Sequence, residues 1–419
     1  MLSLVLLLGA GAPQTVTLDE ALRRSADVGA AGAAVARADA AEARASVAWR
    51  AALLPTLGGE AGYGVRDRDL TLTTPVGAFE LGQRDQLSAV ARLTVPLVRP
   101  ARLFAAPAAS AQAEGARAQS ERARQERRAA VVDAYYAWLA LSADAEANAA
   151  FVLSLEERRT AVRAMVDGGR ALEADLLRVE LALDEAKLGG QRIAAGLEAT
   201  SLDLSRLIGE DEPVVPAAPS GTAAGETRGR EAWIERAYEA RPDVRAARSA
   251  LDALAKAERA VWAEYLPDLE ARGEAIVDNA AIYDETVFFR GSVNLVWTPL
   301  AGLTRPARAA EKSAEARAVT SQLAELERVV RLEVTRAWRD VELAVSAKAV
   351  AERGLAQAEA VAANERLRYA EGRVTTADLL EAEALSRDRR AAAARADWAV
   401  RRAQARLQLA AGVLTAPQS

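Results

Sequence analysis

The chain contains two stretches that share a residue pattern at one fixed separation of 203 residues. The first stretch runs from residue 96 to 209 and the second from 299 to 412, and their alignment has no gap. One inserted residue would rotate the apolar stripe of a helix by about 100° and misplace every side chain beyond it. A repeat without insertions therefore predicts long helices packed side by side in each half of the chain.

Each copy of the repeat is interrupted once by a glycine followed by an arginine. These are Gly169 and Arg170 in the first copy and Gly372 and Arg373 in the second, and the segment Ala-Asp-Leu-Leu follows in both. Glycine adopts positive φ values without strain, so it suits a place where a helix ends and the chain reverses. We expect a tight turn between two helices at each glycine.

The composition fits helix-on-helix packing better than a globular core. Hydrophobic residues make up 51% of the chain, but only 5% of residues are aromatic, and thin alanine-rich stripes suit closely packed helices. The net charge is −5, with acids and bases interspersed. This argues against nucleic-acid binding, which needs a concentrated basic surface. The predicted fold class is mainly α with a small β part, built from long antiparallel helical hairpins.

Missing residue types exclude several kinds of chemistry. The chain has no cysteine and no histidine, so it forms no disulfide and lacks the commonest ligands of zinc and copper. Nucleophilic triads lose their usual base. No Gly-x-x-x-x-Gly-Lys-Ser/Thr motif for nucleotide phosphates occurs. We therefore expect no enzymatic activity, no cofactor and no metal site.

Between the helices, each half contains segments with the alternation of β-strands. Apolar and polar residues alternate in 86–95 and 289–298, and 56–65 and 268–277 are their expected partners. Such segments of about ten residues are typical of transmembrane barrel strands, and a β-hairpin cap on a soluble bundle gives the same pattern. The halves differ in register by one residue near the proline, which indicates either a bulge or a misread strand segment. Because four strands cannot close a barrel and lipid tolerates no open edge, a membrane barrel would need several chains.

Prolines border these strand segments in both halves. A helix does not continue undisturbed through a proline, and the residue before a proline avoids helical geometry. We therefore expect junctions between helix and strand at Pro55, Pro96, Pro267 and Pro299.

Changes in composition divide the chain into five parts. The start, MLSLVLLLGAGA, resembles the apolar part of a signal peptide without its charged leading region; the alternatives are an apolar start or a misassigned start codon. The parts are a signal-like segment (1–14), a first repeat (15–209), a Pro/Gly-rich linker or equatorial region (210–230), a second repeat (231–413) and a tail (414–419). In the first repeat we expect helices over about 17–52, 102–165 and 172–208.

The order of these pieces resembles that of the TolC-type outer membrane efflux proteins, also called outer membrane factors. The matching segments are TLDEAL (17–22), RPDVRAA to YLPDL (241–269), NLVWTPL (294–300) and YAEGRVTTADLLEAE (369–383). The chain departs from the family after its two Pro-Leu pairs, where an F-D-G-G-like turn is common and Val98-Arg99-Pro100 and Ala301-Gly302-Leu303 stand here. It also lacks the cysteine that anchors many relatives to lipid.

The resemblance implies a homotrimer whose strands form a 12-stranded β-barrel in the outer membrane lipid, continued by a long α-helical barrel across the periplasm. Gly169, Arg170, Gly372 and Arg373 would lie at the periplasmic tip, where an adaptor (membrane fusion) protein docks. The energy would come from an inner-membrane pump of the RND, ABC or MFS type. The chain itself would be a passive channel.

The residues after the glycine turns are the candidate entrance of this channel. Asp378 and Glu381 are three residues apart, so a helix places them on one face, and in a trimer each would form a ring of three carboxylates that favours cations. Asp175 is the first-half counterpart of Asp378, and Arg178 stands opposite Glu381 in the alignment, so a closing Arg–carboxylate contact is an option. The alternative is that all four stabilise a helix N-terminus. Tyr369 resembles a family tyrosine that holds the closed state, or it simply packs at the tip.

Two other functions fit the same sequence. The first keeps the fold but changes the cargo to polypeptides of type I secretion, which neighbouring genes would distinguish from small-molecule efflux. The second is a soluble periplasmic coiled-coil scaffold with small β caps. It predicts no pore and no partitioning to the outer membrane.

Overall fold

The computed structural model describes residues 14–68, 70–82, 84–219, 229–278, 286–300 and 302–414. The described chain is mainly helical with a small β part, which confirms the expected fold class at this level. Residues 1–13 of the signal-like segment, residues 220–228 of the linker, Ala301 of the second junction and residues 415–419 of the tail lie outside the described residues.

The chain forms two compact units, and each takes parts from both halves of the sequence. The hairpin unit comprises Met1–Ala36, Ala118–Arg245 and Glu325–Ser419, and the sheet unit comprises Arg37–Arg117 and Ala246–Ala324. Helices α3 (Pro100–Asp167) and α7 (Thr304–Ala370) contribute residues to both units.

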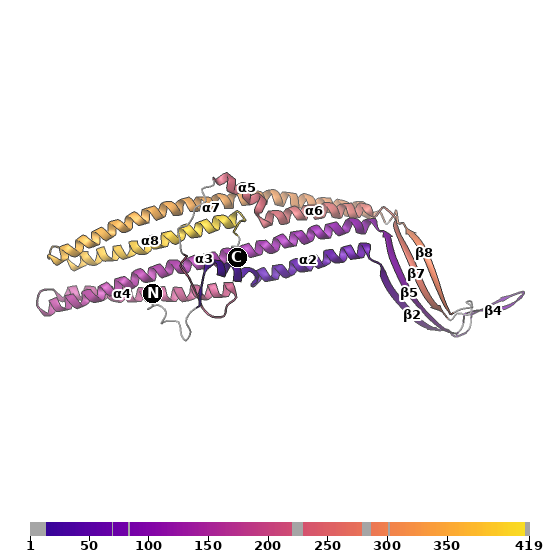
Figure 1. The fold of residues 1–419 in the computed structure, drawn as a ribbon, viewed down its shortest axis with the longest axis horizontal. Helices are drawn as coiled ribbons and strands as arrows, with labels where there is room; N and C mark the ends of the chain where they lie inside the picture. The colour runs from indigo at the N-terminus through magenta and orange to yellow at the C-terminus, as the bar shows by residue number, and fades with distance from the viewer. Residues whose placement is uncertain are drawn as a thin grey trace. The chain divides into compact units, whose positions relative to one another are not determined.

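Two helical hairpins make up most of the hairpin unit. Helix α3 is followed by α4 (Glu173–Ile208), and α7 is followed by α8 (Thr376–Ala410) (Figure 1). The buried apolar residues of α4 recur at spacings that keep one stripe of the helix facing its neighbours; they include Val179, Leu183, Ala186, Leu197 and Leu204. None of the described helices combines the length and apolar character needed to cross a membrane.

A small core joins the start of the chain to the end of α4. Strand β1 (Gln14–Val16) pairs in parallel with β6 (Val214–Pro216). Fully buried Tyr135 of α3 donates its hydroxyl hydrogen bond to the carbonyl oxygen of Ala217, and Ser201 Oγ donates to the Val214 carbonyl at 2.6 Å. The first residues of the repeat are thus fixed by hydrogen bonds as well as by apolar packing.

The single helix predicted over 17–52 is wrong, because the chain breaks there. Helix α1 (Leu18–Arg24) is followed by a 3-10 turn (Ser25–Asp27), and α2 (Ala30–Leu53) begins after Gly29, which has φ of 61°. The aligned segment of the second half breaks as well, between α5 (Arg230–Ala240) and α6 (Pro242–Ala263).

The second break lies at Arg241, whose backbone is extended because the residue before a proline, here Pro242, avoids helical geometry; the buried side chain of Arg241 then holds the break in place. This side chain is 1% exposed and pairs with Asp243 at 2.6 Å and with Glu333 of α7 at 2.5 Å. It also donates to the carbonyl oxygen of Ala410 at the end of α8. Burial alone would raise the pKa of Asp243, but the hydrogen bond and charge of Arg241 outweigh it and hold that pKa below its usual value.

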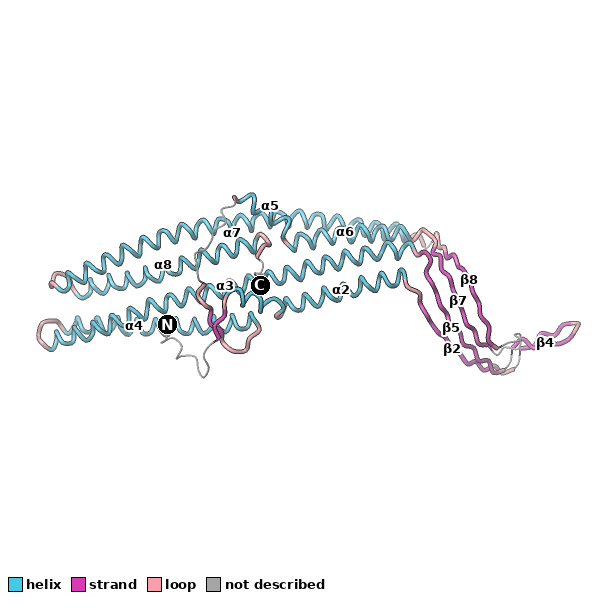
Figure 2. The backbone as a smooth tube through the Cα atoms, in the orientation of Figure 1, coloured by secondary structure: helices cyan, strands magenta, loops and turns pink. Residues whose placement is uncertain are grey.

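The sheet unit contains a four-stranded antiparallel sheet (Figure 2). Its order is β2 (Thr56–Val65), β5 (Asp85–Val98), β7 (Asp268–Asp278) and β8 (Val287–Val296). All four predicted strands are therefore present, with ends shifted by no more than three residues. The predicted bulge is present too, since the pairing of β5 with β7 shifts register between Pro96 and Val98.

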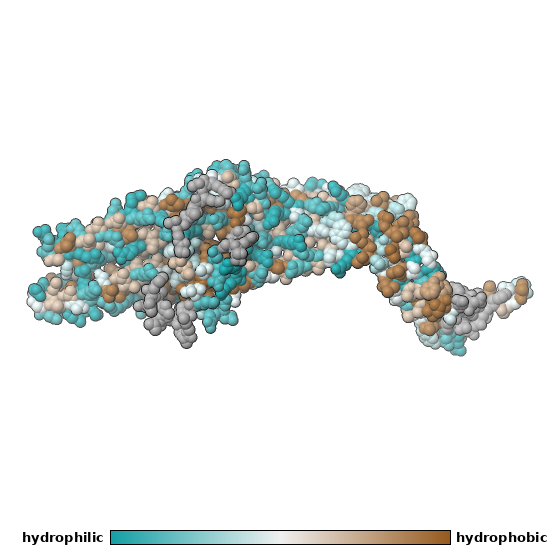
Figure 3. Space-filling view, in the orientation of Figure 1, coloured by the Kyte–Doolittle hydropathy of each residue, from teal (hydrophilic) through white to brown (hydrophobic). Residues whose placement is uncertain are grey.

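The sheet has one apolar and one charged face. Directly paired residues share a face, so Leu57, Leu93, Gly273 and Gly291 form one apolar row. The opposite face carries ion pairs: Arg92 of β5 binds Glu274 of β7 at 2.6 Å, and Glu270 of β7 binds Arg272 of the same strand at 2.8 Å and Arg99, just beyond β5, at 3.0 Å. Hydrophobic residues gather visibly over these strands (Figure 3).

Two details of the sheet unit differ from the sequence expectation. A hairpin of β3 (Leu70–Thr74) and β4 (Gly77–Gly82) is not predicted. Pro96 does not mark a junction, because β5 continues to Val98 and α3 begins at Pro100. A proline has no N–H for the ladder, and the bulge beside Pro96 accommodates it within the strand. Pro55, Pro267 and Pro299 lie in the connections between helix and strand.

Candidate functional site

The two glycine turns that end the hairpins share one backbone geometry. Gly169 and Gly372 have φ of 69° and 70°. In each turn the following arginine donates its N–H back to the last helical turn: Arg170 to Met165 at 2.7 Å and Arg373 to Arg368 at 2.8 Å. A side chain at either glycine would meet no atom within 4 Å, so the left-handed backbone, and not lack of space, requires glycine here.

The helices that follow the turns begin differently. Thr375 caps α8: its hydroxyl oxygen accepts from Asp378 N at 3.2 Å, and the Asp378 carboxylate accepts from Thr375 N at 2.9 Å. The Thr375 hydroxyl also donates to the Asp378 carboxylate at 2.7 Å, and this bond, together with the one from Thr375 N, lowers the pKa of Asp378. Leu172 occupies the matching position before α4 and makes no side-chain cap. The alternative role for Asp378, helix capping, is therefore present in the structure.

Tyr369 lies between the second turn and helix α3. Its hydroxyl is 3.4 Å from Thr376 Oγ1, and the guanidinium of Arg158 lies 5.6 Å from the centre of its ring. Tyr369 of α7 thus contacts α8, the helix after its own turn, and also α3 from the other half of the chain. It also lines a cavity of about 450 Å³ together with Arg158, Arg366 and Glu383.

Glu383 of α8 is the centre of a buried ion cluster beside this tyrosine. Its side chain is 2% exposed, and its Oε1 accepts from Arg158 at 2.8 Å and from Arg366 of α7 at 2.9 Å. Among the described residues, its second oxygen, Oε2, has no hydrogen-bond partner. One carboxylate therefore joins three helices, and removing it would leave two cations without their shared partner.

Sequence reasoning missed this cluster, although a signal exists. Glu383 follows Leu379 and Ala382 on the buried stripe of α8 and precedes Ser386 on it, so it is a carboxylate on a stripe that is otherwise apolar or small. The repeat also places Arg163 and Glu180 at the positions of Arg366 and Glu383, and that pair too is present, at 2.8 Å.

Further contacts join α3 to α8 along the hairpin unit. Asp133 accepts from Arg402 and Arg406 at 2.7 Å each, and Asp144 accepts from Arg395 at 3.0 Å. Burial alone would raise the pKa of Asp133, but the hydrogen bonds from Arg406 and Arg402 hold it below its usual value. Together with the pair of Arg158 and Glu383, these contacts form what we call the α3–α8 seam.

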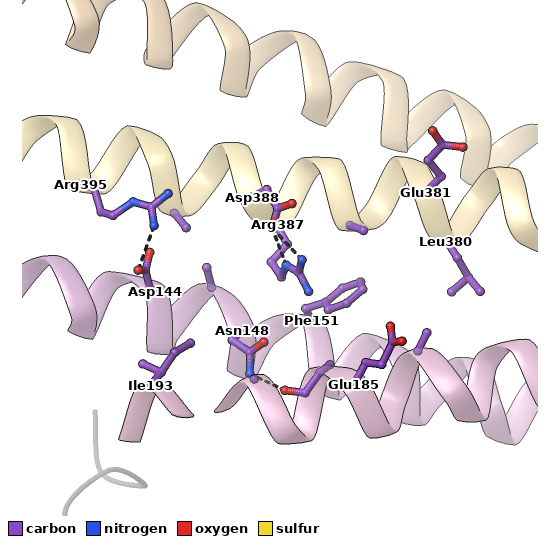
Figure 4. A pocket seen from close by; sticks show the side chains of 16 residues that line it. Asp144, Asn148, Phe151, Glu185, Ile193, Leu380, Glu381, Arg387, Asp388 and Arg395 are labelled. Carbon is purple, nitrogen blue, oxygen red and sulfur yellow. Dashed lines mark hydrogen bonds and ion pairs between the residues drawn. The ribbon is translucent and has the colours of Figure 1, made fainter. Parts of the chain in front are cut away.

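A cavity of about 630 Å³ opens along the seam (Figure 4). Phe151 lies in it with the guanidinium of Arg387 4.5 Å from its ring centre. Asp144, paired with Arg395, borders the same cavity. Side chains therefore leave space between the two hairpins, and the seam consists of separate contacts and not of one continuous core.

The structure brings only some of the predicted entrance residues together. Arg178 pairs with Asp175 at 3.3 Å within α4. In the described chain no ion pair joins Arg178 to Asp378 or to Glu381, so the option of a closing contact between the halves finds no support in a single chain. Glu381 is exposed and borders the seam cavity.

Ion pairs dominate the chemistry of this region. Within the described ranges no group of three or more His, Cys, Asp or Glu residues is placed to hold a metal ion. The paired arginines and carboxylates stabilise one arrangement of the hairpins, and they can separate without breaking a covalent bond.

Comparison with solved structures identifies the fold. The chain superposes on the outer-membrane channel OprN with a TM-score of 0.75 at 18% identity, over 96% of this chain and 91% of OprN. CusC, solved in a study of its transmembrane channel formation, gives 0.77 at 12% identity, over 94% of this chain and 92% of CusC. The open state of the Neisseria gonorrhoeae MtrE outer membrane channel gives 0.74 at 18% identity, over 94% and 89%.

This chain has the fold of outer-membrane channels. The family resemblance seen in the sequence is thus confirmed for the fold, over nearly the whole chain. Sequence comparison alone does not detect this similarity, because no protein-family model matches the chain. No curated protein sequence matches it either.

Proposed function

We propose that the chain is the subunit of a passive exit duct in the outer membrane of a Gram-negative-type envelope. The duct conducts substrates that an inner-membrane pump delivers through a periplasmic adaptor protein. One observation carries the proposal: the four-stranded sheet has an apolar and a charged face, and its edge strands β2 and β8 pair on one side only among the described residues. An open edge is not tolerated in lipid, so such a sheet needs further copies of itself.

A trimer would account for both the open edges of the sheet and its two chemically different faces. If β2 of one subunit pairs with β8 of the next, twelve strands close into a barrel without an edge. The apolar rows then face lipid, and the ion pairs of Arg92, Glu274 and Glu270 line a water-filled interior, as in other membrane barrels. The helical hairpins extend into the periplasm in this arrangement.

The carboxylates after the second glycine turn form the entrance of the proposed duct. Asp378 and Glu381 from three subunits make acidic rings that favour cations, with Asp175 and Arg178 at the first turn beside them. The cluster of Tyr369, Arg158 and Glu383 holds the two hairpins of a subunit together and thereby keeps the entrance narrow. Opening separates the hairpins along the α3–α8 seam.

The adaptor docks at the two glycine turns. Gly169, Arg170, Gly372 and Arg373 are all exposed, and their shared backbone geometry presents two similar surfaces in each subunit. Six such surfaces in a trimer suit a ring of identical adaptor hairpins.

Single-channel conductance in planar bilayers tests the proposal. The wild type should give discrete cation-selective openings, and Asp378→Ala should reduce the cation selectivity. Asp252→Ala is the control, because Asp252 is a half-exposed carboxylate on α6 that pairs only locally with Lys256. Unchanged selectivity in Asp378→Ala would contradict the acidic ring but would be compatible with the duct. Absence of openings from folded protein would favour the soluble scaffold.

A further inference from the structure

Exposed apolar side chains occur wherever the chain passes between sheet and helices in the sheet unit. We call six of these residues the collar: Leu54, Leu97, Leu266, Trp297, Leu300 and Leu303. Their exposed fractions lie between 50% and 79%. The passages from α2 to β2, from α6 to β7 and from β8 to α7 each contain at least one of them, and Leu97 at the end of β5 directly precedes the fourth passage, from β5 to α3. Hydrophobic residues are visible in this region in Figure 3.

Trp297 exposes its ring although its polar atom is satisfied inside the protein. Its Nε1 donates to the carbonyl oxygen of Tyr265 at 2.9 Å, while 58% of the residue is exposed. A tryptophan with an internal hydrogen bond and an outward ring needs an apolar partner and not a polar one. Tryptophan and tyrosine are enriched at the level of lipid headgroups because their rings combine an apolar body with a polar end; in Trp297 the polar end is bonded within the protein, and the ring is left for apolar contact.

In the passage from β8 to α7, Leu303 is exposed although its backbone adopts an unfavourable left-handed conformation. It is the only residue other than glycine with positive φ in the described part of the chain, at 55°, and it is 73% exposed. The buried Arg305 fixes this passage by donating to Pro299 O at 3.1 Å and to Thr298 Oγ1 at 3.3 Å. A strained, exposed and firmly held leucine points to a binding surface.

The position of the collar at or beside all four passages decides what covers it. A second copy of the chain that adds to the sheet does so at β2 or at β8, because only these strands have an open edge. Leu97 lies near the end of the central strand β5, and Leu266 lies in the passage that leads to the central strand β7, so both are away from the two edges. A continuous apolar medium reaches all four passages, whereas a neighbouring strand does not.

We propose that the collar inserts into the boundary between headgroups and acyl chains of a membrane leaflet. Lipid contact then extends past the sheet onto the loops that lead to the helices. This inference rests on the proposed function, since it assumes that the apolar face of the sheet meets lipid. The collar fixes how deep the protein sits in the membrane, because the half-exposed charged residue Arg308 follows it within five residues of Leu303.

Spin labels on single cysteines test the collar, and the chain has no cysteine of its own. The variants are Leu303→Cys and Leu300→Cys in the collar, Phe289→Cys on the apolar sheet face, and Leu343→Cys on α7 as the control. Leu343 is 67% exposed and matches the collar in chemistry and exposure. Each labelled protein is reconstituted in vesicles of phosphatidylethanolamine and phosphatidylglycerol, and collisions with oxygen and with a water-soluble nickel complex are measured.

We expect oxygen collisions to dominate at positions 303, 300 and 289 and nickel collisions to dominate at 343. Nickel access at positions 303 and 300 with oxygen access at 289 would contradict lipid contact of the collar but would remain compatible with the proposed duct. Shielding of 303 and 300 from both reagents would mean that protein covers them, which also overturns it. Nickel access at 289 would overturn the membrane position of the sheet, and the collar with it.

Discussion

The repeat places the same arginine–glutamate pair in both hairpins, but only one copy is buried. Arg163 and Glu180 are 2.8 Å apart with side chains 57% and 33% exposed. Arg366 and Glu383 are 2.9 Å apart, and the Glu383 side chain is only 2% exposed. The difference comes from Arg158 of α3, which covers Glu383 and binds the same oxygen.

The two pairs have the same contact distance but differ in burial, so comparing them shows what burial contributes to the energy of an ion pair. An exposed ion pair contributes little, since water solvates both partners almost as well. A buried carboxylate with two arginines is different, because losing it leaves cations without compensation in a place where water is scarce. The first hairpin therefore carries a dispensable pair, and the second carries one on which the packing of three helices depends.

The largest expected effect is that of removing the buried carboxylate. Glu383→Ala should lower the free energy of unfolding by about 3 kcal/mol, and Glu180→Ala by less than about 1 kcal/mol. Urea unfolding of the detergent-solubilised protein, followed by circular dichroism, measures both. Equal losses in the two variants would show that burial does not distinguish the two copies.

An apolar replacement of the cross-hairpin pair should recover much of this loss. In Glu383→Met with Arg158→Met the buried charges are gone, and the half-exposed Arg366 can turn to solvent. Packed apolar side chains often replace a buried ion pair without loss, so we expect about 2 kcal/mol to return relative to Glu383→Ala in the same urea titration. No recovery would mean that the hydrogen-bond geometry, and not charge compensation, holds the helices.

Removing the charge of Glu383 should also change gating. If the cluster keeps the entrance narrow, Glu383→Gln should raise the open probability in planar bilayers, and Glu180→Gln should leave it unchanged. Identical open probabilities in both variants would place the closed-state contact elsewhere on the seam.

Acid should weaken the seam through Asp133. Its pKa is lower in the folded chain than the usual 3.9 or so of an unfolded aspartate, so its contribution is complete above about pH 4 and is lost as pH falls through the folded value. The stability difference between wild type and Asp133→Asn, at most about 1 kcal/mol for a partly exposed pair, should therefore shrink below pH 4. A difference that is constant from pH 7 to pH 3 would contradict this assignment.

The smallest effects concern the caps that follow the two turns. Thr375→Ala removes the cap of α8 and should cost about 1 kcal/mol. Leu172→Thr would create the same capping box with Asp175 at the start of α4 and should add about 0.5 kcal/mol. Thermal unfolding in detergent compares the two. A loss in Leu172→Thr would indicate that the exposed leucine has a partner that the cap does not replace.

The sequence predicts what depends on local rules. The strand segments, both glycine turns and the long helices follow from alternation, positive φ and helix propensity within short stretches. The break near Gly29 was not predicted, because one glycine within an alanine-rich segment is a weak signal. The ion pair of Asp27 with Arg124 at 2.7 Å, which stabilises the chain beside the break, is a long-range contact that the local sequence does not reveal.

The ion cluster depends on residues too distant for such rules. Arg158 and Glu383 are 225 residues apart, and nothing near either residue tells which helix it will face. Its counterpart Arg163–Glu180 was visible through the repeat, but the repeat is silent on burial, because position 361, which matches Arg158, is a valine. Asp378 and Glu381 were singled out by their spacing, and their role in an entrance stays a prediction.

The shared oxygen of Glu383 sets the order in which the hairpins can come apart. Arg158 belongs to the first hairpin, whereas Arg366 and Glu383 belong to the second, so separation releases Arg158 and leaves the other two joined. The carboxylate keeps its bond from Arg366 during this step, and water takes the place that Arg158 leaves at the same oxygen, Oε1. At this cluster, separation therefore exchanges one partner of a carboxylate for water and leaves the contact within the second hairpin intact, while the pairs of Asp133 and Asp144 with their arginines must also part.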